Sequence, residues 1–304
     1  MYPILVSIGP LALSSFGLFL SLAILFGSFV IWRLAKVYDL DPEKVLDLIL
    51  LTFIGGLLGA RLYFVALNFS KFNSLTQIIL INRYPGLTFW GGLFLGIVVL
   101  YLLSKRLKFD FWLIADLAAV GLFLGLAVGS IGCLLAGCQY GVPTNSLLAV
   151  TQVGLIAKRF PIQALYSLMY LIGFFMLWGI CLRFHFKGKV ATLGLIVLTI
   201  IIFFLGFFRA DSSKIYAQFS LDHFISAVLF IVSLVIYYHQ SRRSLKRDLN
   251  SIMAVFVSSK SRNLLLSKFL KSWYNFQVNL RLLVTRWYKK ATRKFHVKSN
   301  PTQF

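Results

Sequence analysis

The sequence predicts an all-α membrane protein, a bundle of seven transmembrane helices followed by a basic cytoplasmic tail. Of its 304 residues 59% are apolar and 13% are charged, whereas a soluble domain usually carries about 25% charged residues. About 20 apolar residues cross a bilayer as a helix, and such stretches leave no room for a sizeable water-soluble core. In chain order they are residues 11–34, 46–68, 86–103, 113–135, 162–182, 190–208 and 221–238.

Small residues mark several of these stretches. The second and third contain the glycine clusters Gly55-Gly56-x-x-Gly59 and Gly91-Gly92-x-x-x-Gly96. We interpret both clusters as packing positions, because small residues let membrane helices approach closely. The fourth stretch runs into a small-residue segment, residues 129–141, the fifth begins after Pro161, and the sixth ends at Arg209.

Basic residues predict the orientation, because cytoplasmic loops are enriched in lysine and arginine. Basic clusters follow the first, third, fifth and seventh stretches, so these four ends are expected on the cytoplasmic side. The N-terminus is then outside the membrane and the C-terminus in the cytoplasm. The clusters are Arg33, Lys36 and Lys44; Lys105, Arg106 and Lys108; Arg183, Lys187 and Lys189; and Arg242, Arg243, Lys246 and Arg247.

We expect two domains, a membrane domain at residues 1–240 and a tail at 241–304. The tail holds fifteen lysines and arginines and one acid, Asp248. Over residues 262–294 its apolar side chains recur at steps of three and four, which predicts an amphipathic helix. A basic face opposite aromatic residues is typical of a helix lying on the anionic inner leaflet. Basic charge alone would also suit RNA, but the apolar stripe favours the membrane, and no nucleic acid partner is expected.

Three polar residues stand out within or beside the apolar stretches. Arg61 lies inside the second, where an arginine is costly and suggests function; it either snorkels to lipid phosphates or holds a phosphate with its fork of donors. Arg209 is either an interfacial anchor paired with Asp211 or a ligand of the same phosphate. Gln163 is either a plain helix-start residue or part of a site.

The cysteines and histidines do not have the spacing of a metal site, and no metal is expected. We interpret Cys133, Cys138 and Cys181 as small apolar packing residues. Asp116 is interpreted as structural, and His223 as an interfacial residue.

Six stretches resemble, in order, those of the prolipoprotein diacylglyceryl transferase family. The resemblance covers residues from about 5 to 240 and none of the tail. The most informative stretch closes the fourth helix and resembles the signature Gly-Arg-x-Gly-Asn/Cys-x-x-x-Gly-x-x-x-Gly. The stretches are residues 7–13, Gly59-Ala60-Arg61-Leu62, Leu87-Thr88-Phe89-Trp90-Gly91-Gly92-Leu93, residues 129–141, Pro161-Ile162-Gln163 and Phe207-Phe208-Arg209.

The resemblance implies an activity, partners and a site. Enzymes of the family move a diacylglyceryl group from phosphatidylglycerol to the thiol of a lipobox cysteine in a prolipoprotein, and glycerol phosphate leaves. Phosphatidylglycerol and a prolipoprotein signal peptide are then the expected partners, in a bacterial plasma membrane, without a cofactor. The substrate-binding residues are expected to line one outward-facing cavity that is open to lipid: Arg61, Trp90, Ser130, Gln139, Gln163 and Arg209.

The sequence departs from the family at its polar positions. Trp90 stands where the family has histidine, Ser130 replaces the signature arginine, and Leu198 and Ile202 replace a tyrosine and an arginine. Gly206 stands where the family has a glutamate before Phe-Phe-Arg. No catalytic residue can therefore be assigned, and three hypotheses remain: a divergent active transferase, an inactive paralogue that binds phosphatidylglycerol or signal peptides, and a protein of another lipid-headgroup transfer.

Overall fold

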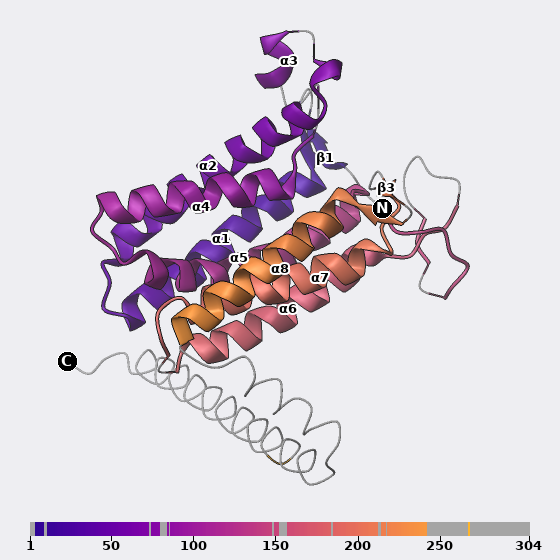
Figure 1. Cartoon of the computed structure of the whole chain (residues 1–304). Coiled ribbons are helices and arrows are strands. Elements are labelled where there is room, and N and C mark those ends of the chain that lie inside the picture. The colour runs from indigo at the N-terminus through magenta and orange to yellow at the C-terminus, as the bar shows by residue number, and fades with distance from the viewer. Residues whose placement is uncertain are drawn as a thin grey trace, which may run out of the picture. The chain divides into compact units, whose positions relative to one another are not determined.

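The structure is a computed structural model, and its helices run roughly along one common direction (Figure 1). It describes residues 4–8, 11–72, 74–79, 84, 86–147, 149–151, 157–183, 185–211, 214–216, 218–241 and 267. Seven helices in this part are long and apolar enough to cross a membrane, which confirms the predicted fold class. They are α1 (Ser15–Val37), α2 (Pro42–Leu67), α4 (Phe89–Arg106), α5 (Phe111–Ala136), α6 (Ile162–Cys181), α7 (Lys189–Gly206) and α8 (Leu221–Ser241). The predicted tail helix at 262–294 lies outside the described residues, Ser267 excepted.

The first apolar stretch does not begin as a helix. The residues before α1 form an antiparallel hairpin of β1 (Ile4–Ile8) and β2 (Leu11–Ser14), so the helix expected from residue 11 begins four residues later. The side chain of Ser14 sets that start, because its Oγ accepts a hydrogen bond from the backbone of Gly17 at 3.1 Å. Serine is a favoured residue at this capping position.

One end of the bundle carries all the small elements, and we call it the hairpin end. There α1, α4, α6 and α8 begin, and α2, α5 and α7 end. Figure 1 shows β1, α3 and β3 grouped at this end. The short elements are η1 (Phe69–Lys71) and α3 (Leu75–Ile79) between α2 and α4, and the paired strands β3 (Lys214–Tyr216) and β4 (Phe219–Ser220) before α8.

Short connections at the opposite end are fixed by capping residues. Asp41 caps α2 through a 3.1 Å bond from Glu43 N, and Pro42 takes the first helical position, where its missing N–H costs nothing. Asp110 caps α5 and pairs with Lys187 at 2.7 Å. This hydrogen-bonded ammonium holds the pKa of the Asp110 carboxyl below its usual value.

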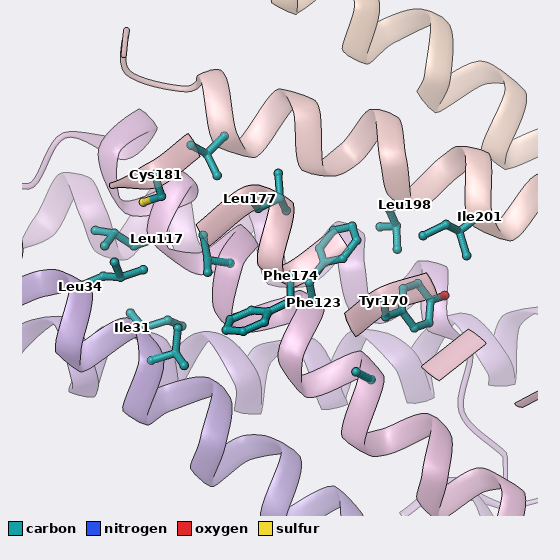
Figure 2. Close-up of a cluster of buried hydrophobic side chains, with 14 of the residues drawn as sticks. Ile31, Leu34, Leu117, Phe123, Tyr170, Phe174, Leu177, Cys181, Leu198 and Ile201 are labelled. Carbon is teal, nitrogen blue, oxygen red and sulfur yellow. The ribbon is translucent and has the colours of Figure 1, made fainter. Parts of the chain in front are cut away.

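The core is centred on α5, which packs against α1, α6 and α7 (Figure 2). The ring of Phe123 lies against Gly173 of α6, where an added Cβ would come within 2.5 Å of the ring. Large apolar side chains also cover the outside of the bundle; Leu62 and Phe204, for example, are 60% and 61% exposed. Such a surface would be unstable in water, whereas lipid tails cover it at no cost.

The pair α2 and α4 is in close backbone contact. A Cβ added to Gly59 would lie 2.5 Å from the carbonyl oxygen of Gly91, and the reverse distance is also 2.5 Å. The glycine clusters are therefore packing positions, as predicted. This contact fixes the beginning of α4, where Trp90 lies, against the end of α2, where Arg61 lies.

Candidate functional site

All six predicted site residues lie near the hairpin end. Arg61 is in the last two turns of α2, Trp90 is the second residue of α4, and Ser130 is in the last two turns of α5. Gln139 follows α5, Gln163 is the second residue of α6, and Arg209 follows α7. Except for Gln139, their side chains belong to three groups of contacts.

The first group, which we call the carboxylate cluster, consists of Trp90, Arg209, Asp211 and Asp222. Arg209 donates from Nε and Nη2 to the two carboxylate oxygens of Asp211 at 3.0 and 3.2 Å, and from Nη1 to Oδ2 of Asp222 at 2.9 Å. The other oxygen of Asp222 accepts a 2.8 Å hydrogen bond from Nε1 of Trp90. Asp222 thus joins two predicted site residues that are 119 positions apart in the sequence.

The guanidinium of Arg209 is held firmly in its charged form. Burial alone would lower the pKa of Arg209, but the hydrogen bonds and charge of Asp211, together with the charge of Asp222, outweigh it and raise the pKa above its ordinary value. The three ions give the cluster one positive and two negative formal charges. In the described structure three of the five N–H donors of Arg209 are used, and two remain.

The second group is centred on Arg61, which is 5% exposed. Four of its five N–H donors go to backbone carbonyl oxygens of the connection between α2 and α4. The guanidinium also lies 5.3 Å from the ring of Phe72. Arg61 therefore organises this connection, a role that neither sequence hypothesis foresaw. The acceptors are Gln77 at 2.9 Å, Ile78 at 2.7 Å, Tyr84 at 2.8 Å and Gly86 at 3.0 Å.

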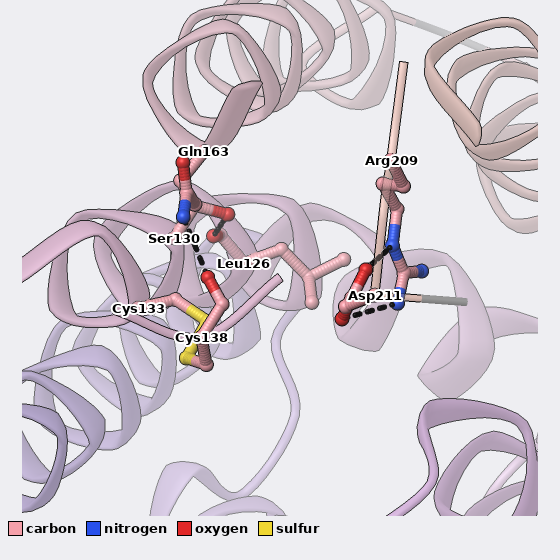
Figure 3. The surroundings of a disulfide bond; sticks show 7 residues. All are labelled: Leu126, Ser130, Cys133, Cys138, Gln163, Arg209 and Asp211. Carbon is pink, nitrogen blue, oxygen red and sulfur yellow. Dashed lines mark hydrogen bonds and ion pairs between the residues drawn. A yellow bond between two sulfur atoms is a disulfide. The ribbon is translucent and has the colours of Figure 1, made fainter. Parts of the chain in front are cut away.

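The third group surrounds a disulfide bond between Cys133 and Cys138 (Figure 3). Our interpretation of these two cysteines as packing residues is therefore wrong. The helix α5 ends at Gly137, whose φ of 83° is left-handed, and Gly137 N and Cys138 N both bond to the carbonyl of Cys133. This turn brings the second sulfur back to the first. A glycine C-cap between the two cysteines was the available signal.

The disulfide lies beside Gln163 and Ser130 (Figure 3). Nε2 of Gln163, a fully buried side chain, donates to the carbonyl of Cys138 at 2.6 Å. Ser130 donates its hydroxyl to the carbonyl of Leu126 at 2.7 Å, one helical turn before it. The hydrogen that Ser130 could have given to a phosphate is thus used within α5, and its oxygen can still accept.

The segment after the disulfide connects the third group to the carboxylate cluster. Gly141 forms an antiparallel bridge with Arg209, and Ala210 N donates to the carbonyl of Tyr140 at 2.9 Å. Gln139 lies in this segment with a φ of 52°, a conformation that is uncommon for residues other than glycine. Backbone strain of this kind is often found at functional sites.

Two buried polar atoms of α6 lack a hydrogen-bond partner among the described residues. They are Oε1 of Gln163 and the hydroxyl of Tyr166, one turn later on the same face of α6. The Tyr166 hydroxyl lies close enough to the Arg209 guanidinium for a weak hydrogen bond, and Asp222 is within electrostatic range. Most buried polar atoms are paired in folded proteins, so these two are suited to the polar groups of a ligand.

Sequence reasoning missed Asp222 and Tyr166 as site residues. Asp222 carried no prediction, although an acid that begins an apolar stretch is itself a signal. Tyr166 follows Gln163 by three residues, which is the spacing of one helix face. The ring of His223 is buried against Gly206 and Phe207 at the beginning of α8, and its position at the membrane interface stays a prediction.

Two of the apolar replacements lie in the hydrophobic core. Leu198 and Ile202 of α7 are both buried there, so neither side chain offers a polar contact. Within the described ranges, no group of three histidine, cysteine or acidic side chains could hold a metal ion.

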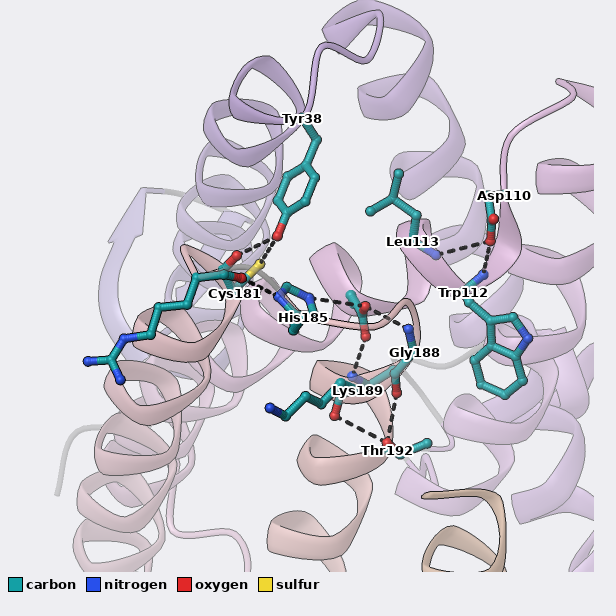
Figure 4. A network of polar contacts seen from close by, with 12 residues as sticks. Tyr38, Asp110, Trp112, Leu113, Cys181, His185, Gly188, Lys189 and Thr192 are labelled. Atoms are coloured by element: carbon teal, nitrogen blue, oxygen red, sulfur yellow. Dashed lines mark hydrogen bonds and ion pairs between the residues drawn. The ribbon is translucent and has the colours of Figure 1, made fainter. Parts of the chain in front are cut away.

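A second polar network lies at the opposite end and is structural (Figure 4). Asp116 of α5 accepts hydrogen bonds from Gly188 N at 2.8 Å and Ala191 N at 2.7 Å, so it caps the start of α7. His185 approaches the same carboxylate at 3.5 Å, and Tyr38 donates to the carbonyl of Cys181. The structural interpretation of Asp116 agrees with these contacts.

The described residues include seven helices that are long and apolar enough to cross a bilayer, and they define a polytopic membrane protein. The chain belongs to the prolipoprotein diacylglyceryl transferase family, whose family model matches residues 3–239. It is a multi-pass membrane protein of a bacterial family.

Several bacterial relatives carry the name phosphatidylglycerol–prolipoprotein diacylglyceryl transferase. The protein of Synechococcus elongatus is 34% identical over 143 residues, which are 47% of this chain and 50% of that protein. Transferase 2 of Clostridium perfringens is 26% identical, over 75% of this chain and 91% of its own length. The Streptococcus pneumoniae protein is 27% identical, over 79% of this chain and 95% of its own length. The chain thus spans about half the length of the first relative and nearly all of the other two.

Proposed function

We propose that the protein is a phosphatidylglycerol–prolipoprotein diacylglyceryl transferase. The observation that carries the proposal is the joining of Trp90 and Arg209 through Asp222. Both residues lie in stretches that resemble the family's site, and the cluster sits at one end of the bundle, where a headgroup and a secreted substrate can both reach it. The relatives' names and the family match over residues 3–239 support the same activity.

The unpaired polar atoms suit the headgroup of phosphatidylglycerol. A phosphate accepts hydrogen bonds, which the two remaining N–H donors of Arg209 and the Tyr166 hydroxyl can give. The headgroup glycerol carries hydroxyl hydrogens, which Oε1 of Gln163 can accept. Donors fixed on the departing phosphate stabilise its charge in the transition state. Two carboxylates already share Arg209, so its hold on a phosphate is weaker than that of an unpaired arginine.

The finer proposal is that Arg61, Ser130 and Gln139 line the same headgroup site. Their common position near the hairpin end supports it, as does the pairing of Gly141 with Arg209. Arg61 has one N–H donor beyond the four that bind carbonyls, and the oxygen of Ser130 can accept. A cavity shared by all six residues stays a prediction.

A second candidate is an inactive paralogue that binds phosphatidylglycerol or a lipoprotein signal peptide. The buried, apolar Leu198 and Ile202 favour it, because the family has a tyrosine and an arginine at these positions. In this case the orphan atoms of Gln163 and Tyr166 would hold a ligand without any transfer of its diacylglyceryl group.

Complementation separates the two candidates. The chain is expressed in a bacterium depleted of its own transferase, and prolipoprotein maturation is followed by gel mobility. An active transferase should restore the mature band. The inactive paralogue should leave the precursor, while phosphatidylglycerol still copurifies with the protein in native mass spectrometry. If neither prolipoprotein maturation nor lipid retention is observed, both candidate functions are contradicted.

We also propose that the hairpin end faces outward and that the tail binds the anionic inner leaflet. The basic clusters and the amphipathic pattern of residues 262–294 support this orientation. A specific protease site inserted after Ser241 should be cut in inverted membrane vesicles and protected in intact spheroplasts. The released tail should sediment with the vesicles at low salt and leave them at high salt, because salt screens its charges. Cleavage in spheroplasts would reverse the orientation.

A further inference from the structure

The transfer reaction needs a group that accepts the thiol proton, because the thiolate is the nucleophile. The tryptophan at position 90 cannot take this role, since its indole is a donor only. We propose that Asp222 accepts the proton of the acceptor cysteine thiol, an inference that rests on the proposed function.

The geometry of Asp222 suits a proton acceptor. Its carboxylate offers about four lone-pair positions, of which Trp90 and Arg209 occupy one on each oxygen. The side chain is 25% exposed, so a substrate can approach the remaining positions.

The other titratable groups around Asp222 are less suitable. Asp211 gives both oxygens to Arg209 and does not contact Trp90 in the described structure. Nδ1 of His223 accepts the backbone N–H of Ser220 at 3.1 Å, so in the neutral ring Nε2 carries the hydrogen and cannot accept another. The tyrosines facing the cluster, Tyr166 and Tyr170, are donors while protonated.

The step balances as a single displacement. The thiol gives its proton to the Asp222 carboxylate. The sulfur forms a bond to the carbon of the diacylglyceryl group that bears the phosphate ester. The bond between that carbon and the ester oxygen breaks, and its electron pair leaves on the phosphate. The products are a thioether and glycerol phosphate, whose charge lies near Arg209. Asp222 then returns its proton to water.

The test uses the full-length protein in detergent, with phosphatidylglycerol in mixed micelles and a cysteine-containing lipobox peptide. Asp222→Ala should lower kcat by about 100-fold or more, the contribution of a general base, with KM for the peptide little changed. Formate should restore at least about tenfold of the loss by filling the space of the carboxylate. Asp222→Asn should lose as much without rescue, because its amide fills that space.

Asp211→Asn is the matched control, since it removes the other carboxylate from Arg209. It should lower KM for phosphatidylglycerol, because one carboxylate fewer then shares Arg209, and formate should not change its rate. Absence of transfer by the wild type would contradict the proposed function itself. With an active wild type, the role of Asp222 would be overturned by an Asp222→Ala variant that keeps its kcat, or by one that unfolds at the wild-type temperature and whose lost rate formate does not restore. Unchanged thermal unfolding of Asp222→Asn shows that the variant is folded.

Discussion

Replacing Arg61 by alanine should lower the free energy of unfolding by about 3 kcal/mol or more and loosen the connection between α2 and α4. Arg61 donates four hydrogen bonds to carbonyls of that connection, and a hydrogen bond to a charged group contributes roughly 1.5–3 kcal/mol. Water can replace part of the lost hydrogen bonding at those carbonyl oxygens that are half-exposed. Thermal unfolding in detergent measures the stability, and tryptic cleavage after Lys71 reports on the connection.

Two further variants sharpen this test. Arg61→Lys should keep only part of the stability, because a compact ammonium cannot reproduce a rigid fork of five donors. Arg33→Ala removes an exposed arginine at the opposite end of the bundle and should unfold like the wild type. If Arg61 chiefly held a lipid phosphate, its loss would lower lipid retention while the connection stayed resistant to trypsin. That outcome would contradict the structural role.

The transmembrane helices could be predicted because their signal is local. Composition and the length of each apolar stretch decide whether a segment crosses a bilayer, and the charged or capping residues at its ends decide where it stops. The prediction was wrong at residues 11–14, where apolar residues continue the stretch but pair with β1. Hydropathy cannot distinguish a short apolar strand from the first turn of a helix.

The site could be predicted only as far as helix position determines it. Arg61, Trp90, Gln163 and Arg209 lie near helix ends, so the end of the bundle they share follows from counting residues. The hydrogen-bond partners of these residues do not follow from counting. The bond from Trp90 to Asp222, for example, joins residues 132 positions apart and depends on how two helices are rotated about their axes.

The disulfide could not be predicted from the sequence either, although its two cysteines are close in the chain. Cys133 and Cys138 are five positions apart, and on a continuous helix they would not face each other. Only the left-handed turn at Gly137 brings them together. The turn residue was visible in the sequence, but its conformation became decisive only once α5 was known to end there.

The second large effect is expected at Gly59, where α2 and α4 are in backbone contact. Gly59→Ala would place a Cβ 2.5 Å from the carbonyl oxygen of Gly91, and a backbone atom cannot move aside as a flexible side chain can. Overpacking of this kind costs about 1–3 kcal/mol. The beginning of α4 would shift away from α2, and Trp90 would move with it.

Transfer activity should therefore fall more steeply than stability. A displacement of about 1 Å can cost roughly 100-fold in rate, and the 2.8 Å bond from Trp90 to Asp222 would lengthen first. Gly179→Ala in α6 is the matched control, because an added Cβ there meets no atom within 4 Å; it should keep full activity and gain slightly in stability. Equal activities of the two alanine variants would show that the close contact of α2 and α4 does not position Trp90.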